Sequence, residues 1–223
     1  MTKVKVCGIT SAHDARAAVV AGADAIGFVF AESPRRVSPE QARDILRALP
    51  SSRCVPVGVF VDESPDRMIE MAEFVGLHVL QLHGDEPPDM VKELLAHGFD
   101  VVKSFRVSAE KDMVKLLSAY RPTALLLDTY VEGKRGGTGR TFDWQRAVEA
   151  KRFGRVILSG GLGVDNVVEA VRVASPYGVD ASSRLEIRPG VKDHERVREF
   201  IRLAKSRPSD AGADDSEREP WPR

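Results

Sequence analysis

The sequence has few of the features that would mark a secreted, membrane or nucleic-acid-binding protein. Its 223 residues include two cysteines, Cys7 and Cys54, which are too few for a disulfide framework. Basic and acidic residues number 33 each, and this balance gives no sign of a nucleic-acid or acidic-membrane partner. The first residues lack an apolar signal core, and no apolar run approaches the roughly 20 residues that span a bilayer. These absences predict a soluble, reduced, cytoplasmic protein.

The chain does contain a regular alternation of short apolar runs and amphipathic helical patterns. The predicted strands are Val4–Cys7, Ala25–Phe30, Val55–Phe60, His78–Leu82, Val101–Phe105, Ala124–Asp128, Val156–Ser159 and Gly178–Asp180. The predicted helices cover residues 12–20, 39–48, 65–74, 90–96, 111–119, 144–151, 165–173 and 195–205. Pro39 suits the first position of its helix, and Asp165 is the expected N-cap of another.

Strands that are apolar nearly throughout indicate a parallel sheet buried on both faces. An open doubly wound sheet could use the same units, but eight is the number that closes a barrel. We therefore predict an α/β fold, a single-domain (β/α)8 TIM barrel over residues 1–206, with its chemistry at the carboxyl ends of the strands. Residues 207–223 are polar and aperiodic, which predicts a disordered tail; the alternative is a partner-binding segment around Trp221.

Two residues at strand ends are candidates for acid–base chemistry. Cys7 ends the first strand before Gly8, where a cysteine is either a small core residue or a catalytic thiol. Asp128 ends the apolar run of the sixth strand, where a carboxylate is costly unless it is paired or used; its alternative role is to cap the next loop. The two would face each other across a mouth about a nanometre wide. Cys54 precedes the third strand, on the stability face, and is expected to be buried and inert.

The last two strands are followed by segments suited to a phosphate. Ser159 is followed by Gly160 and Gly161, which allow a ligand to approach backbone N–H groups closely. Asp180 is followed by Ala181, then by Ser182 and Ser183, which could open a short extra helix. Barrels often bind phosphate at these two loops, although two ordinary turns would look the same. The glycine-rich stretch 133–144 is long enough to be a mobile lid and lacks the ending of a nucleotide phosphate loop.

Nine ordered motifs give the chain a family resemblance. They are Lys5–Thr10, Gly22–Phe28, Ser33–Arg35, Gln81–Gly84, Leu127–Thr129, Gly136–Gly139, Phe142–Trp144, Ser159–Leu162 and Pro189–Asp193. From about Val4 to the last helix the sequence resembles phosphoribosylanthranilate isomerase. The resemblance implies an Amadori rearrangement in tryptophan biosynthesis, in which N-(5-phosphoribosyl)anthranilate becomes an open-chain aminoketose. It implies Asp128 as the acid and Cys7 as the base, a small-molecule substrate, and no metal or organic cofactor.

The resemblance also implies how the substrate is held. Arg35 of the Ser-Pro-Arg motif would bind the anthranilate carboxylate, with Arg36 as the alternative if the loop register shifts. Gln81 and His83 would line the pocket, and Asp180 would bond the amine or the hydroxyls of the substrate. Gly160, Gly161, Ser182, Ser183 and Arg184 would hold the phosphate.

One position departs from the family pattern. Arg184 stands where the family usually has glycine, and it would be strained if the backbone there must be left-handed. If only the backbone amide matters, the arginine could add a charge for the phosphate.

Two rival functions have specific counter-evidence in the sequence. The related isomerase of histidine biosynthesis, or a bifunctional form, would have aspartate in place of Cys7 and a second phosphate site in the first half. Here the loops after the third and fourth strands carry Asp62, Glu63, Asp85 and Glu86, which suit a phosphate poorly. A barrel that only binds a sugar phosphate would need neither Cys7 nor Asp128. The sequence leaves open whether the protein is a monomer or a homodimer.

Overall fold

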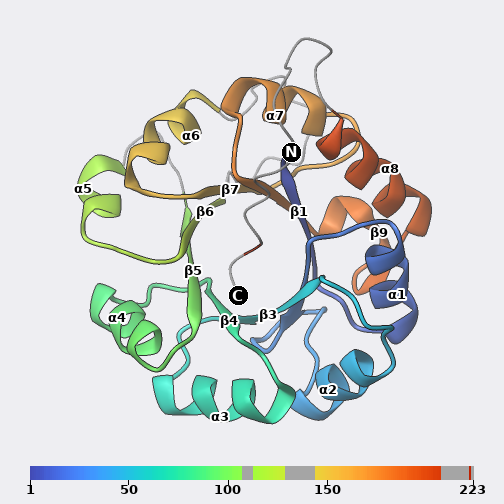
Figure 1. Cartoon of the computed structure of the whole chain (residues 1–223), viewed down its shortest axis with the longest axis horizontal. Coiled ribbons are helices and arrows are strands. Elements are labelled where there is room, and N and C mark those ends of the chain that lie inside the picture. Colours follow the sequence, from blue (N-terminus) through green and yellow to red (C-terminus); the bar gives the residue numbers. More distant parts are fainter. Residues whose placement is uncertain (107–112, 129–143, 207–220, 222–223) are drawn as a thin grey trace.

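Eight parallel strands close into a barrel in this computed structural model, which describes residues 1–106, 113–128, 144–206 and 221. Figure 1 shows the strands as an inner ring surrounded by the helices. The strands are β1 (Lys3–Cys7), β2 (Ala25–Val29), β3 (Val55–Phe60), β4 (Val79–Leu82), β5 (Asp100–Arg106), β6 (Ala124–Asp128), β7 (Val156–Ser159) and β8 (Gly178–Ala181). The predicted (β/α)8 barrel is confirmed, including its short last strand.

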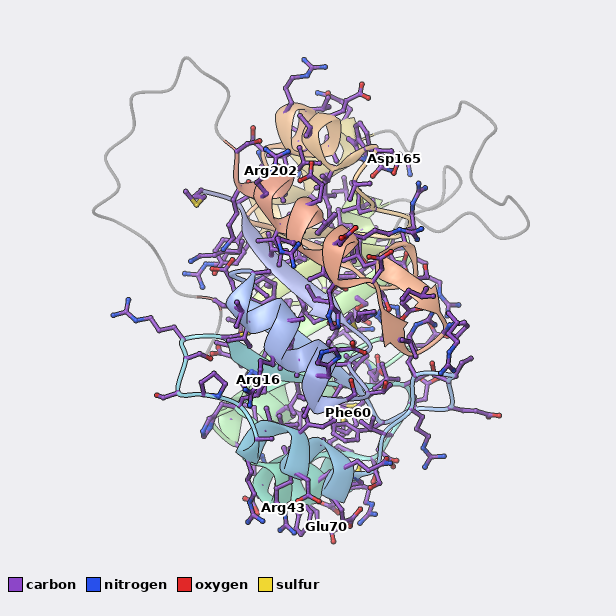
Figure 2. The ribbon with its side chains drawn as sticks, turned by 90° about the vertical axis from the view of Figure 1, so that its right-hand side faces the viewer. Arg16, Arg43, Phe60, Glu70, Asp165 and Arg202 are labelled. Carbon is purple, nitrogen blue, oxygen red and sulfur yellow. The ribbon has the colours of Figure 1, made fainter. Side chains whose placement is uncertain are left out.

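Helices follow the strands in turn and form the outer layer. They are α1 (Ala12–Val20), α2 (Pro39–Arg47), α3 (Pro65–Val75), α4 (Pro88–Ala96), α5 (Met113–Ser118), α6 (Gln145–Ala150), α7 (Val167–Ala174) and α8 (His194–Lys205). Figure 2 shows this layer from the side, with Arg16 on α1, Glu70 on α3 and Arg202 on α8. None of the helices in the described part of the chain has the length and apolarity needed to cross a membrane.

Additional short elements follow β7 and β8 or lie near them. The 3-10 helix η1 (Lys151–Phe153) precedes β7, and the 3-10 helix η2 (Ser183–Leu185) follows β8. Strands β9 (Glu186–Arg188) and β10 (Val191–Lys192) then form a small antiparallel sheet before α8. This hairpin folds over the carboxyl end of the barrel and returns residues from late in the chain to the site described below.

The helix starts are set by local capping. Ser38 accepts a hydrogen bond from the Gln41 N–H, and Gln41 bonds back to Ser38, so α2 begins with a capping box and with Pro39 at its first position, as predicted. The prediction of Asp165 as an N-cap was wrong. Helix α7 begins at Val167 after Asn166, because the Asn166 side chain closes a turn with the N–H of Gly163 and Asp165 pairs with Arg184 instead.

Strand side chains alternate between two apolar layers. Those that point outward, such as Val6, Phe28 and Leu127, belong to the large core between the strands and the helices. Those that point inward at the amino ends of the strands form a second cluster inside the barrel: Ala25, Val57, Val79, Val102, Ala124, Leu126 and Ile157. The barrel interior is therefore packed at this end.

Trp221 belongs to that inner cluster. Its side chain is 2% exposed, its ring centroid lies 6.2 Å from that of Tyr177, and it is close to Gly178 at the start of β8. The ring therefore closes the amino-terminal opening of the barrel. The other residues of the tail predicted to be disordered, 207–220 and 222–223, lie outside the described residues, and for them the disorder stays a prediction.

Candidate active site

Cys7 and Asp128 lie at the same end of the barrel, because β1 and β6 are parallel and each residue is the last of its strand. Strands β7 and β8 separate β6 from β1 around the ring, so the two side chains stand on different sides of the mouth. This is the arrangement that the sequence predicted from the strand ends alone.

Cys7 is a buried free thiol whose space is provided by a glycine. Gly27 pairs with Cys7 across β1 and β2, and a Cβ added there would lie 2.8 Å from Cys7 Sγ and 3.1 Å from Lys5 Nζ. Any side chain at this position would collide with the sulfur. Burial raises the pKa of the Cys7 thiol, the positive charge of Lys5 lowers it, and Asp180 raises it further.

Lys5 forms a buried ion pair beside this thiol. Its side chain is 1% exposed, and Nζ lies 3.0 Å from Asp180 Oδ1 on the adjacent strand β8. Burial acts to lower the pKa of Lys5, but the charges of Asp180 and Cys7 outweigh it, and the net pKa is raised. Asp180, predicted to bind substrate, is also 3.3 Å from the Ser159 hydroxyl. Its oxygens therefore have partners within the barrel.

Asp128 faces one ring nitrogen of His83, and two polar side chains contact the other ring nitrogen. His83 Nε2 lies 3.4 Å from Asp128 Oδ2. Gln81 Nε2 lies 2.9 Å from His83 Nδ1 and Ser104 Oγ lies 2.8 Å from it. These two contacts fix the orientation of the His83 ring toward Asp128. Of the two residues predicted to line the pocket, His83 does so and Gln81 orients it.

A cavity of about 220 Å³ opens at the carboxyl ends of β4 to β6. His83, Ser104 and Asp128 are on its wall, together with Lys103, Arg106 and Tyr120. Its wall is therefore polar, and its volume is smaller than the roughly 300–1,000 Å³ of typical ligand pockets.

Arg35 is held by a carboxylate from the β9–β10 hairpin. Its Nε and Nη2 lie 2.8 and 2.7 Å from the two oxygens of Glu186, which is a bidentate pair. The hydrogen bonds that Arg35 donates to Glu186 raise the pKa of Arg35. The other edge of the guanidinium, including Nη1, is left to bind a second planar carboxylate. Arg35 crosses over Gly8, whose φ of +75° and closeness to the Arg35 side chain both require glycine.

Lys192 completes this group from β10. Its Nζ lies 2.8 Å from Glu186 Oε1 and 3.3 Å from the carbonyl oxygen of Ser182. Burial lowers the pKa of Lys192, and Glu186 works against that shift. Burial also acts to raise the pKa of Glu186, but its hydrogen bonds from Arg35 and Lys192 outweigh it, and the net pKa is lowered. One buried carboxylate thus organises two cations beside Cys7.

The predicted phosphate loops lie next to each other, since β7 and β8 are paired. Gly160 and Gly161 have φ of +81° and +68°, which a residue with a side chain adopts only with strain. Ser182 precedes the short helix η2, which Ser183 begins, so the predicted extra helix is present. The loop with the two glycines and the loop with the two serines therefore follow neighbouring strands at the same end of the barrel.

Arg184 fits its position without left-handed strain. Among the described non-glycine residues, positive φ occurs at Asp62 and Ser175 and not at Arg184. Its Nη2 lies 2.7 Å from Asp165 Oδ1, and its side chain passes close to Gly163. The departure from the family's glycine therefore ties the loop after β8 to the loop after β7.

Within the described residues, the group suited to a metal ion is formed by His13, Asp14 and His194. Asp14 accepts from the Lys192 N–H at 3.2 Å and lies 2.7 Å from His194 Nε2. Both histidines lie in the first turn of a helix, where the positive end of the helix dipole opposes a cation. The group joins α1, α8 and β10, and we assign it a structural role.

Two further predictions concern Cys54 and the glycine-rich loop before α6. Cys54 is partly buried before β3, and burial raises the pKa of its thiol to about 12, which fits an inert cysteine. Residues 133–143 of the predicted lid lie outside the described residues.

The sequence analysis missed three charged residues of this site: Lys5, Glu186 and Lys192. Lys5 had a local signal, because residues two apart on a strand point to the same face and Cys7 follows it by two. Lys192 lies within the motif Pro189–Asp193, but the motif alone gave it no role. Glu186 had no signal, because it meets Arg35 across 151 residues of sequence.

Comparison with known proteins gives a consistent result. Residues 4–203 match the family described as N-(5'phosphoribosyl)anthranilate (PRA) isomerase. The chain is 50% identical over 208 residues to the N-(5'-phosphoribosyl)anthranilate isomerase of Geobacter sulfurreducens, covering 92% of this chain and 99% of that protein. It is 47% identical over 207 residues to the Rubrobacter xylanophilus protein of the same name, covering 92% of this chain and all of that one.

Solved structures agree with the sequence relatives. The phosphoribosyl anthranilate isomerase from Thermotoga maritima has a TM-score of 0.84 at 44% identity, covering 92% of this chain and 99% of that one. A second structure, in complex with reduced 1-(o-carboxyphenylamino)-1-deoxyribulose 5-phosphate, has a TM-score of 0.81 at 41% identity with the same coverage. The chain belongs to the phosphoribosylanthranilate isomerase family.

Proposed function

We propose that this protein is a phosphoribosylanthranilate isomerase, which converts N-(5-phosphoribosyl)anthranilate to 1-(2-carboxyphenylamino)-1-deoxyribulose 5-phosphate in tryptophan biosynthesis. The observation that carries the proposal is the placement of Cys7 and Asp128 at the ends of β1 and β6, on one mouth of a barrel of this family. A thiol and a carboxylate on different sides of one opening can act on two different atoms of one substrate.

The first step requires an acid, and we assign it to Asp128. In its protonated form Asp128 gives a proton to the furanose ring oxygen, the bond from C1 to that oxygen breaks, and the nitrogen lone pair forms a Schiff base with C1. His83 Nε2, 3.4 Å from Asp128 Oδ2, is placed to hold the carboxyl group in position.

The second step requires a base, and we assign it to Cys7. The thiolate removes the proton from C2, the electron pair forms a C1=C2 double bond, and the cationic nitrogen becomes neutral. Protonation of C1 and loss of the C2 hydroxyl proton then give the ketone. C1 is reduced and C2 is oxidised within one molecule, so the balance needs no external oxidant or reductant.

The remaining groups account for the two ends of the substrate. The free edge of the Arg35 guanidinium suits the anthranilate carboxylate, because Glu186 occupies only the Nε side. The glycines after β7 and the serines after β8 suit the phosphate. The relative solved with a reduced product analogue supports a small-molecule ligand of this class.

The loops after β3 and β4 argue against a bifunctional isomerase with a second phosphate site. Glu86 is buried there and accepts from the N–H groups of Asp62 and Gly84, so these backbone donors are already used. Asp62 in turn accepts from the Asp85 N–H at 2.7 Å. An incoming phosphate would meet negative charge instead of free amides.

The setting of the enzyme is part of the same proposal. We place it in the cytoplasm, as a monomer or a homodimer, and size measurement by light scattering would decide between the two. A Thermotoga maritima relative is described as dimeric.

The test of the function is an assay that follows the loss of fluorescence of freshly made phosphoribosylanthranilate. The parent should consume it, and Cys7→Ser should lose about 10²–10⁴ in turnover, because a hydroxyl is a far weaker base near neutral pH. Cys54→Ser is the matched control and should turn over like the parent, since Cys54 lies before β3 at the other end of the barrel. Near-parental turnover in Cys7→Ser would overturn the role given to Cys7.

A further inference from the structure

We propose that Lys5 is a positioning residue for the catalytic base: its buried ammonium favours ionisation of Cys7 against the effect of burial, and it fixes the place of the sulfur in the mouth of the barrel. This inference deepens the proposed function and rests on it for the identity of the base.

The first support is geometric. Lys5 and Cys7 are two residues apart on β1 and therefore point to the same, inner side of the strand. Both side chains converge on the space above Gly27, where a single added carbon would contact Sγ and Nζ at 2.8 and 3.1 Å. Among the described residues, the three atoms nearest to that point all belong to Cys7 and Lys5.

The second support is the cost of burying Lys5. It is among the largest fully buried side chains described, and a buried ammonium strongly destabilises a fold unless it is paired. Asp180 supplies that pair at 3.0 Å. An apolar residue would fill the same interior volume without this cost, so the retained charge points to a chemical role.

The third support is the set of charges that face the sulfur. Lys5 on β1, Lys192 on β10 and Arg35 after β2 are cationic, and Asp180 on β8 is anionic. Lys192 and Arg35 share Glu186, whereas the Lys5 ammonium and the Cys7 sulfur converge on the space above Gly27 and interact electrostatically. Burial raises the pKa of the Cys7 thiol, and Lys5 is the largest influence that lowers it. The pKa of Lys5 is itself raised, so the ammonium remains charged when the thiol ionises.

The experiment measures ionisation of Cys7 directly and needs no turnover. In a Cys54→Ser background, Cys7 is the only thiol, and its rate of alkylation by iodoacetamide is followed against pH. Lys5→Met should raise the midpoint of this pH profile by about one pH unit or more, which lowers the thiolate fraction at neutral pH about tenfold. Asp180→Asn should lower the midpoint, because it removes the negative charge. Lys3→Met, the same substitution on the same strand, should leave it unchanged.

Opposite shifts of the alkylation midpoint in Lys5→Met and Asp180→Asn distinguish this role from a merely structural one, because a structural effect would shift both midpoints in the same direction. An unchanged or lower midpoint in Lys5→Met overturns the proposal, as does a shift of the same sign in Asp180→Asn. Should Lys5→Met fail to fold because Asp180 is left unpaired, Lys5→Met/Asp180→Asn removes both charges. Its midpoint should still exceed the parent's, because Lys5 influences the thiol more strongly than Asp180, and a midpoint at or below the parent's overturns the proposal.

The isomerase assay adds a separate readout. Lys5→Met should lose about tenfold or more in kcat at neutral pH, recover as the pH rises, and keep a KM near that of the parent. If the alkylation shifts appear but the parent does not consume phosphoribosylanthranilate, the proposed function fails while the Lys5–Cys7 coupling stands. If the parent is active but the shifts are absent, the coupling fails alone.

Discussion

The two ends of the barrel interior are built from opposite kinds of side chain. At the amino ends of the strands, inward positions are apolar, as in Val57, Val79 and Ile157, and Trp221 closes the opening. At the carboxyl ends, the inward positions of β1 and of β4 to β8 are polar or ionisable, whereas β3 keeps the apolar Val59; the polar set is Lys5, Cys7, Gln81, Ser104, Asp128, Ser159 and Asp180. On β6, for example, the inward side chain of Leu126 is apolar, and the next inward side chain along the strand is the carboxylate of Asp128.

This difference separates stability from chemistry. Apolar burial stabilises the fold by roughly 25 cal/mol per Å², whereas buried ion pairs such as Lys5–Asp180 contribute little or are costly. The charged end is retained for what it does, and the apolar end supports it. Substitutions at one end should therefore change activity with little loss of stability, and substitutions at the other end should do the reverse.

The largest expected effect is on Asp128, at the charged end. Asp128→Asn keeps the shape of the side chain but has no acidic proton for the ring oxygen. Turnover should fall by about 10²–10⁴, while the midpoint of thermal unfolding stays close to the parent's. Single-turnover rates on fresh substrate measure the first quantity, and calorimetry measures the second.

The control for Asp128→Asn is affinity for a reduced product analogue, which needs no proton transfer. We expect affinity close to the parent's. If affinity falls together with the rate, Asp128 binds the ligand instead of protonating it, and the acid must be another residue of the rim.

The next effect is on Arg35, which stands at the edge of the charged end. Arg35→Ala should raise KM by about 10- to 100-fold, from the loss of roughly 1.5–3 kcal/mol of charge-assisted bonding, with a smaller change in kcat. Arg36→Ala is the matched control, because only Arg35 makes the bidentate contact with Glu186. A rise in KM confined to Arg36→Ala would show that the neighbouring arginine holds the carboxylate.

The charged end also shows how far sequence reasoning reaches. Apolar runs between turn signals locate all eight strands, and the parallel topology then gathers Cys7, Asp128 and Asp180 at one end without any further information. The partners of these residues could not be found in this way. Lys5 looks like a surface lysine until the barrel closes and Asp180, 175 residues away, lies beside it.

Trp221 shows the same limit at the apolar end. The composition around Trp221 is typical of disorder. Composition does not show that the amino-terminal opening of the barrel can accommodate the indole ring. Its burial depends on the shape that the amino ends of eight strands form together. The side chain lies beyond residues 4–203, which match the family, so a family pattern does not predict it either.

Trp221→Ala tests the apolar end. Truncating a buried tryptophan costs about 3–5 kcal/mol, but here ordering the chain terminus offsets part of that, and we expect a loss of about 1–2 kcal/mol in the free energy of unfolding. The kcat should not change. Denaturant titration measures the loss, and acrylamide quenching in a Trp144→Phe background reports whether the parent ring is buried.

Trp221→Phe is the matched control for that loss. Within the described residues, the buried Trp221 Nε1 has no hydrogen-bond partner, so phenylalanine removes an unsatisfied donor and keeps most of the ring. Its stability should be close to the parent's. If Trp221→Ala unfolds like the parent, and the Trp221 indole is freely quenched in folded Trp144→Phe, the ring does not close the barrel in solution.

The smallest effect should come from Arg184, which lies at the charged end but outside its buried groups. Its pair with Asp165 is partly exposed, and such pairs contribute at most about 1 kcal/mol. Because Asp165 holds the Arg184 guanidinium, Arg184→Ala should raise KM by less than about threefold. Asp165→Asn weakens that hold on the guanidinium and should therefore lower KM. Competition by inorganic phosphate, measured in both variants, reports on the phosphate loops alone. A tenfold higher inhibition constant for inorganic phosphate in Arg184→Ala would instead mean that Arg184 binds the phosphate directly. Position 184, where the family usually has glycine, would then supply an additional phosphate-binding side chain.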